Sequence, residues 1–66
     1  KQALSEMEIK TLKQICMGKT NKEIADALYR GVKAVDEYVQ NLLVKLGLRN
    51  RVELAVWAIK TGFCTP

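Results

Sequence analysis

The chain of 66 residues contains no histidine, and its two cysteines stand far apart in the sequence. Histidine is the commonest metal ligand and a frequent general base, and neither cysteine belongs to a CxxC or similar ligand spacing. The carboxylates are scattered, and no glycine-rich loop follows a strand pattern. We therefore expect no enzyme, no metal site and no cofactor.

Proline occurs once and glycine four times, so the composition does not indicate disorder or a long linker. A chain of this length is expected to form a single domain, residues 1–66. The apolar runs are far shorter than the about 18 residues of a membrane span, and no charged-then-apolar leader opens the chain. These absences predict a cytoplasmic protein without a membrane partner. The first residue is Lys1 rather than Met, which predicts that a segment precedes it.

The missing ligand spacing leaves two interpretations of the cysteines. Free cysteines are often small buried apolar residues, and we expect this role for Cys16. A disulfide between Cys16 and Cys64 stays open as the alternative.

Basic residues exceed acidic ones, with eleven Lys and Arg against seven Asp and Glu. The excess is spread evenly: residues 1–30 hold six basic and four acidic residues, and residues 31–66 hold five and three. A net charge of +4 favours an anionic partner but does not identify one.

Apolar residues recur three and four positions apart along most of the chain, and no segment alternates with a period of two. This periodicity predicts four helices, over residues 5–17, 21–28, 32–46 and 51–61. A tight turn joins the second helix to the third. The fold class is therefore all-α, a four-helix helix-turn-helix domain.

Three of the four expected helix starts share one signature, a capping residue followed three positions later by Glu, which is typical of a capping box. Glycines mark the breaks between the helices. The capping pairs are Ser5 with Glu8, Thr20 with Glu23, and Asn50 with Glu53, and the glycines are Gly18, Gly31, Gly47 and Gly62.

The last helix has more apolar surface than one core requires. Leu54, Ala55 and Ala58 form one stripe, and a second stripe lies beside it. We expect the second stripe to be a homodimer surface, because a symmetry-related copy is the economical way to bury it. The alternative is that the first helix covers both stripes. The second stripe comprises Val52, Val56 and Ile59.

Several motifs resemble the LuxR/FixJ/NarL-type helix-turn-helix domain over nearly the whole chain. The matching segments are TNKEIADAL at residues 20–28, KLG at 45–47 and NRVELAVWAIKTG at 50–62, preceded by Leu4, Ser5, Glu8 and Gly18. This resemblance implies the C-terminal effector domain of a bacterial transcription regulator. It also implies double-stranded DNA as partner, a weak homodimer through the last helix, and an N-terminal receiver or ligand-sensing domain.

The chain departs from the family at the start of the third helix, where the family usually has Ser-x-x-Thr-Val-Lys-x-His. Here those positions are Gly31, Ala34, Val35, Asp36 and Tyr38. The resemblance implies that the Thr position holds a backbone phosphate and that the Lys position faces phosphate or base. Ala34 has no hydroxyl to donate, and Asp36 reverses the charge.

The outer face of the third helix is predicted to enter the major groove. Carboxylates there can accept from cytosine N4, and Gln40 can pair with adenine. The expected DNA-binding residues of this face are Lys33, Asp36, Glu37, Gln40 and Asn41, with Val44 beside them. The supporting cations are expected from Lys19, Lys22, Lys45, Arg49 and Arg51.

The acidic pair of Asp36 and Glu37 admits two further interpretations. The third helix could face a protein partner instead, which makes the chain a divergent helix-turn-helix with weak or no DNA binding. Alternatively, the two carboxylates merely interact favourably with the helix dipole, a contribution of about 0.3 to 1 kcal/mol each. This last interpretation is compatible with either function.

Three more side chains carry expectations of their own. Asn21 is predicted to bond local backbone at the entrance of the second helix. Trp57 is predicted to be partly buried packing. Arg30 stands where the family has an aliphatic residue under the turn, so either Tyr29 fills that space or the turn itself differs.

Overall fold

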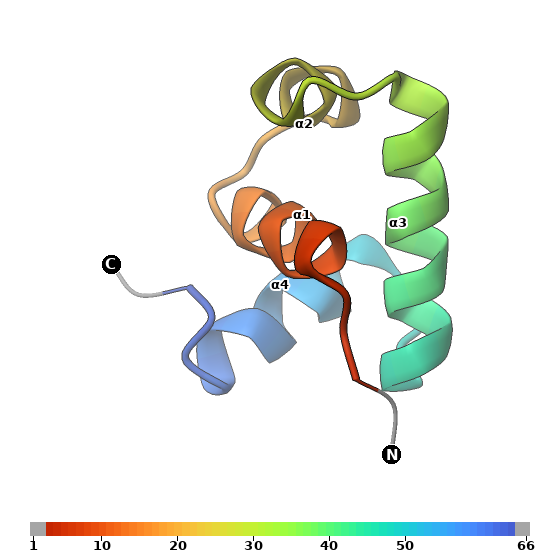
Figure 1. Cartoon of the computed structure of the whole chain (residues 1–66). Coiled ribbons are helices and arrows are strands. Elements are labelled where there is room, and N and C mark those ends of the chain that lie inside the picture. The colour runs from red at the N-terminus through yellow and green to blue at the C-terminus, as the bar shows by residue number, and fades with distance from the viewer. Residues whose placement is uncertain (1–2, 65–66) are drawn as a thin grey trace.

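The computed structural model describes residues 3–64, which form four helices and no strand. They are α1 (Glu6–Cys16), α2 (Asn21–Leu28), α3 (Val32–Leu46) and α4 (Arg51–Lys60). In Figure 1, α3 stands along one side of the molecule, α2 lies across its N-terminal end, and α1 lies between α2 and α4. The all-α prediction is confirmed, and each helix starts and ends within one residue of its expected range.

Two of the three expected capping boxes are present. The Ser5 backbone N–H donates to Glu8 Oε1 at 2.9 Å, and the Glu8 N–H donates back to Ser5 Oγ at 3.2 Å. Thr20 and Glu23 make the same pair of bonds, at 2.8 and 3.2 Å. Both hydrogen bonds in each box satisfy backbone donors that the first helical turn leaves without partners.

The prediction of the third capping box is only half right, because the bond from the Asn50 backbone N–H to Glu53 is not formed. Asn50 Oδ1 accepts from the Glu53 N–H at 2.9 Å, as expected. The Glu53 carboxylate, however, accepts from the Arg49 backbone N–H at 2.7 Å rather than from Asn50. The Arg49 guanidinium lies 3.3 Å from the same carboxylate, so its charge holds Glu53 one residue further back.

The core lies where all four helices meet. Its apolar side chains come from the inner faces of the helices, as the 3.6-residue periodicity requires. Leu12, Ile24, Val35, Leu42, Leu54 and Ala58 are completely buried, and Ile15, Ala25 and Val39 nearly so. The core therefore fixes which face of α3 points outward.

The turn between α2 and α3 is closed by Tyr29, not by Gly31. Tyr29 has the left-handed backbone conformation (φ 56°, ψ 44°), and the Arg30 N–H donates to the Ala25 carbonyl at 2.9 Å. Gly31 begins α3 in an extended conformation. The Tyr29 side chain is 90% exposed, so it does not fill the space under the turn.

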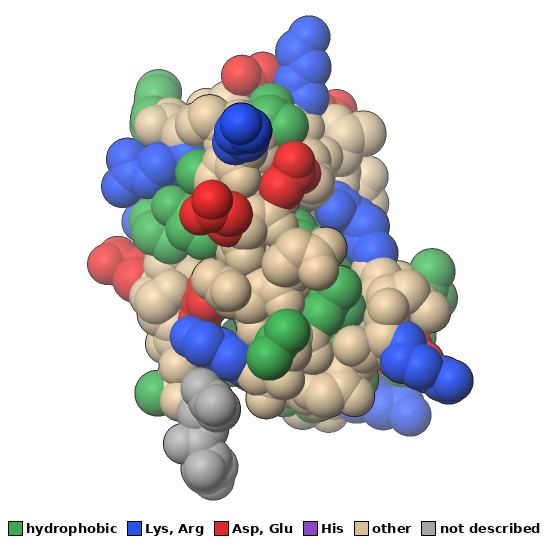
Figure 2. All heavy atoms as spheres, turned by 90° about the vertical axis from the view of Figure 1, so that its right-hand side faces the viewer, with side chains coloured by type: hydrophobic (Ala, Val, Ile, Leu, Met, Phe, Trp, Pro, Cys, Tyr) green, Lys and Arg blue, Asp and Glu red, His purple; other side chains and the backbone are tan. Residues whose placement is uncertain are grey.

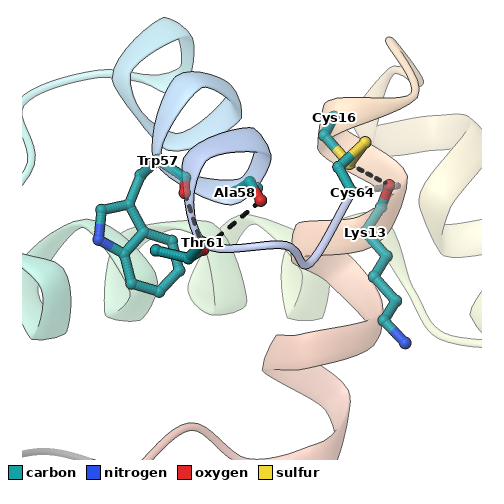
Figure 3. The surroundings of a disulfide bond; sticks show 6 residues. All are labelled: Lys13, Cys16, Trp57, Ala58, Thr61 and Cys64. Atoms are coloured by element: carbon teal, nitrogen blue, oxygen red, sulfur yellow. Dashed lines mark hydrogen bonds between the residues drawn. A yellow bond between two sulfur atoms is a disulfide. The ribbon is translucent and has the colours of Figure 1, made fainter. Parts of the chain in front are cut away.

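A disulfide joins Cys16 at the end of α1 to Cys64 (Figure 3), with the Cα atoms 6.0 Å apart. The interpretation of Cys16 as a simple buried residue is therefore wrong. The chain turns back after α4: Gly62 is left-handed (φ 84°), and the Phe63 N–H donates to the Ala58 carbonyl at 2.9 Å. This return places Cys64 beside α1, a contact that helix periodicity does not reveal.

Candidate nucleic-acid interface

The outer face of α3 is open to solvent along its whole length. The six residues predicted for this face are all exposed, whereas Val35, Val39 and Leu42 on the opposite side are buried. Figure 2 looks onto α3, where acidic and basic side chains lie close to one another over its upper half. The six exposed residues are Lys33, Asp36, Glu37, Gln40, Asn41 and Val44.

Asp36 is not a free carboxylate, because Asn21 at the start of α2 binds it. Asn21 Nδ2 donates to Asp36 Oδ1 at 2.6 Å. On its other side, Asn21 Oδ1 accepts from Arg51 Nη1 at 2.5 Å, and Arg51 Nη2 donates to the Lys19 carbonyl at 2.5 Å. We call this chain of hydrogen bonds, from Lys19 O through Arg51 and Asn21 to Asp36, the Asn21 bridge.

The prediction that Asn21 bonds local backbone is therefore wrong. Thr20 Oγ1 already accepts the Glu23 N–H, the donor that a capping side chain at the start of α2 would take. Asn21 is left to bond side chains from α3 and α4. No Cα atom of α2 lies within 8 Å of one in α4, so the Arg51 side chain spans the space between these helices.

Besides Arg51 in the Asn21 bridge, two of the expected DNA-binding cations form ion pairs within the molecule. Lys45 Nζ lies 2.7 Å from Glu8 Oε1, and the Glu8 side chain is only 4% exposed. Arg49 pairs with Glu53 on the surface. Within residues 3–64, Lys22 and Lys33 are exposed and form no ion pair. Among the described residues, these two lysines have no ion-pair partner to give up before they contact an anion.

The pKa of the Glu8 carboxyl is lowered from its ordinary value. Burial raises the pKa, but the hydrogen bond from Lys45, the Ser5 backbone N–H and the Lys45 charge together outweigh it. Glu8 was predicted only as a capping residue. Its second role, as the buried partner of a lysine 37 positions away, has no local sequence signal.

The second apolar stripe of α4 is on the surface. Val52, Val56 and Ile59 are 72%, 44% and 59% exposed, so the alternative that α1 covers both stripes is wrong. A shallow groove runs beside the stripe, lined by Leu48, Val52, Glu53, Val56, Trp57 and Lys60. Trp57 is half-buried as predicted and stacks on Phe63, with ring centroids 5.5 Å apart.

The part of the chain that the structure describes has no cluster of three potential metal ligands and no helix long and apolar enough to cross a membrane. Of the residues in the Asn21 bridge, only Asn21 was not predicted for the DNA-binding face, and none of the contacts in the bridge was predicted. The sequence did contain a signal: Asn21 directly follows Thr20, and Thr20 already accepts the backbone N–H that a capping side chain would bind.

Comparison with known proteins adds a family. The sequence model of "bacterial regulatory proteins, luxR family" matches residues 2–58. The transcriptional regulatory protein LnrK of Bacillus subtilis (strain 168) is 37% identical over 59 residues, which cover 89% of the chain and 27% of LnrK. The uncharacterized transcriptional regulatory protein YhcZ of the same strain is 44% identical over 57 residues, 86% of the chain and 27% of YhcZ. The oxygen regulatory protein NreC of Staphylococcus aureus (strain JH9) is 40% identical over 57 residues, 86% of the chain and 26% of NreC. The chain thus spans about a quarter of the length of these relatives.

Proposed function

Because the chain belongs to the luxR family of bacterial regulatory proteins, a family of helix-turn-helix transcription regulators, we propose that it binds a specific DNA sequence with α3 in the major groove. The exposed face of α3 carries this proposal. An α-helix fits the major groove of B-DNA, and the buried opposite face prevents α3 from rotating its polar residues away.

The chemistry of the α3 face suits base reading. Gln40 and Asn41 can each make two hydrogen bonds to adenine, and a carboxylate such as Glu37 can accept from cytosine N4. Val44, 79% exposed, offers an apolar contact for a thymine methyl group. These four residues can contact adenine, the cytosine amino group and the thymine methyl group, and such contacts distinguish A·T from G·C pairs.

Phosphate contacts are proposed from Lys22 and Lys33, with Arg49, Lys45 and Arg51 in support. Lys45 has to leave the Glu8 carboxylate to reach DNA, whereas Arg51 keeps three guanidinium N–H groups beyond the two in the Asn21 bridge. Few free cations on α3 mean few released counterions. Non-specific affinity is therefore expected to be low, with a shallow salt dependence.

The stripe of Val52, Val56 and Ile59 is proposed as a weak homodimer surface that places two copies of α3 on one operator. From the family we further propose that a receiver or ligand-sensing domain precedes the described domain. We also propose that the protein acts in the bacterial cytoplasm.

The test is a selection of duplexes from a random pool, followed by titration of the selected operator. Lys33→Ala should weaken all duplexes about equally and reduce the salt slope by about 1, as expected for one lost phosphate contact. Gln40→Ala should cost about 1 to 3 kcal/mol and relax the preference at one base pair. Lys13→Ala, at an exposed position of α1, is the matched control. A pool from which no sequence is enriched would favour a protein partner for α3.

A further inference from the structure

The two adjacent carboxylates of α3 have different surroundings. Asp36 and Glu37 are both exposed, but only Asp36 is bonded to another element, through the Asn21 amide at 2.6 Å. Glu37 has no hydrogen bond or ion pair among the described side chains. The Asp36 carboxylate is therefore held by a hydrogen bond, whereas the neighbouring Glu37 carboxylate is not.

We propose that Asp36 is a positioning residue: through Asn21 it orients the Arg51 guanidinium for a phosphate contact, and it does not read a base. The inference rests on the proposed DNA binding. It also reverses the simplest interpretation of the departure from the family pattern, in which an acidic residue on a recognition helix either selects cytosine or repels DNA.

The donor and acceptor pattern of the Asn21 bridge supports this role. An asparagine amide has one donor end and one acceptor end, and the Asp36 carboxylate can only accept. Asp36 therefore binds the NH₂ end of Asn21 and leaves its oxygen for Arg51 Nη1. If the amide turned over, its NH₂ group would face the guanidinium, which has no acceptor. Asp36 thus fixes the amide orientation that holds Arg51.

The positions of the three residues explain why such fixing matters. Asn21 and Asp36 are 15 residues apart, and Arg51 and Asn21 are 30 apart, so the bridge joins three helices at the N-terminal end of α2. That end carries free backbone N–H groups and is where an anion binds favourably. Arg51 is half-buried and donates to the Lys19 carbonyl there, with three N–H groups left over. An arginine held in this way meets a phosphate without first losing side-chain freedom.

The test separates the charge of Asp36 from its hydrogen bond. Asp36→Asn and Asp36→Ala both remove the charge, but only the Asn side chain keeps an oxygen that can accept from Asn21. Affinity for the selected operator and its salt slope are measured for both variants, alone and in an Asn21→Ala background. Asp26→Asn and Asp26→Ala, at an exposed position of α2 outside the proposed interface, form the matched control pair.

The positioning role predicts that Asp36→Ala binds the operator at least about fivefold more weakly than Asp36→Asn, with a salt slope smaller by about 1. In the Asn21→Ala background this difference disappears. Base preference stays the same in all Asp36 variants. A role in folding alone would lower the midpoint of thermal unfolding and leave the salt slope unchanged, which would overturn the proposal.

Three further outcomes would overturn the positioning role of Asp36. Equal operator affinity for Asp36→Asn and Asp36→Ala overturns the positioning role while DNA binding stands. A changed preference at one base pair in both variants makes Asp36 a base reader and overturns it too. If neither the unmodified chain nor any variant binds a selected duplex better than random DNA, the proposed function fails, and the positioning role fails with it.

Discussion

The two ends of the molecule are held together by different kinds of interaction. Where α1, α4 and the C-terminal return meet, the disulfide and the stacked rings of Trp57 and Phe63 fasten the chain. Where α2 meets α3 and α4, polar side chains make the Asn21 bridge. A covalent bond with apolar packing does not exchange with solvent, whereas polar side chains can form further hydrogen bonds with water or phosphate. The end proposed to meet DNA is the one whose polar groups, such as the three remaining Arg51 N–H groups, are left to bind a further partner.

The largest expected effect concerns the covalent end. The disulfide closes a sequence separation of 48 residues, and its reduction is expected to lower the free energy of unfolding by about 4 kcal/mol through the entropy of the unfolded chain. Cys16 Sγ lies 3.0 Å from the Lys13 carbonyl, to which the thiol of the reduced form can donate. Urea unfolding with and without reductant measures the change. A Cys16→Ser, Cys64→Ser double variant should resemble the reduced protein and show no response to reductant.

The ion pair between α1 and α3 has the next largest expected effect, and this effect depends on pH. Because the pKa of Glu8 is lowered in the folded state, its contribution is complete above the ordinary pKa of the carboxyl and is lost as the pH falls through the lower, folded-state pKa. Glu8→Gln should reduce the free energy of unfolding by about 1 to 3 kcal/mol near neutral pH, since Lys45 loses its buried partner. Thermal unfolding over a pH series tests both statements. The variant should lose less stability than the unmodified chain on acidification; parallel curves would contradict the assignment.

The comparison also predicts a separation between self-association and DNA binding. Val56→Asp places a charge in the exposed stripe of α4 and is expected to weaken the homodimer at least about tenfold, which corresponds to about 1.4 kcal/mol. Sedimentation equilibrium at several concentrations measures this. Val44→Asp, which adds the same charge on the exposed face of α3, should leave self-association unchanged. Equal effects of both variants would argue against α4 as the dimer surface.

The smallest effect is expected at the turn between α2 and α3. The Tyr29 backbone has the left-handed conformation, which is unfavourable for a residue with a Cβ atom. Its ring is almost fully exposed and contributes little packing. Tyr29→Gly is therefore expected to raise the free energy of unfolding by about 0.5 to 1 kcal/mol, the relieved strain less the added freedom of the unfolded chain. Chemical denaturation measures it. Tyr38→Gly serves as contrast, because a glycine within α3 should destabilise.

Local rules predicted the helices well, because their causes lie within four residues of one another. The Ser5 and Thr20 caps, the outward face of α3 and the left-handed Gly47 at its end follow from spacing alone. The left-handed backbone of Tyr29 was not predicted by these rules. The break was predicted at Gly31, two positions later, but Gly31 is the extended N-cap residue of α3.

The candidate site was predictable only in part. Exposure of Gln40 and Glu37 follows from helix periodicity, so the α3 face could be named from the sequence. The partners of Asp36 and Lys45 could not, because their separations of 15 and 37 residues are set by how the helices pack. From the sequence alone, Asp36 counted as a free anion and Lys45 as a free cation. Their contacts change what each has left to offer DNA.

The disulfide makes residues 16–64 a covalent ring. A protease that cuts once within that ring, for example beside the exposed Arg30, opens it without releasing a fragment. The nicked and intact proteins then differ in mass by a single water until a thiol reagent is added. In a reducing compartment the same cut yields two separate peptides, so the redox conditions of a digestion decide what it reports.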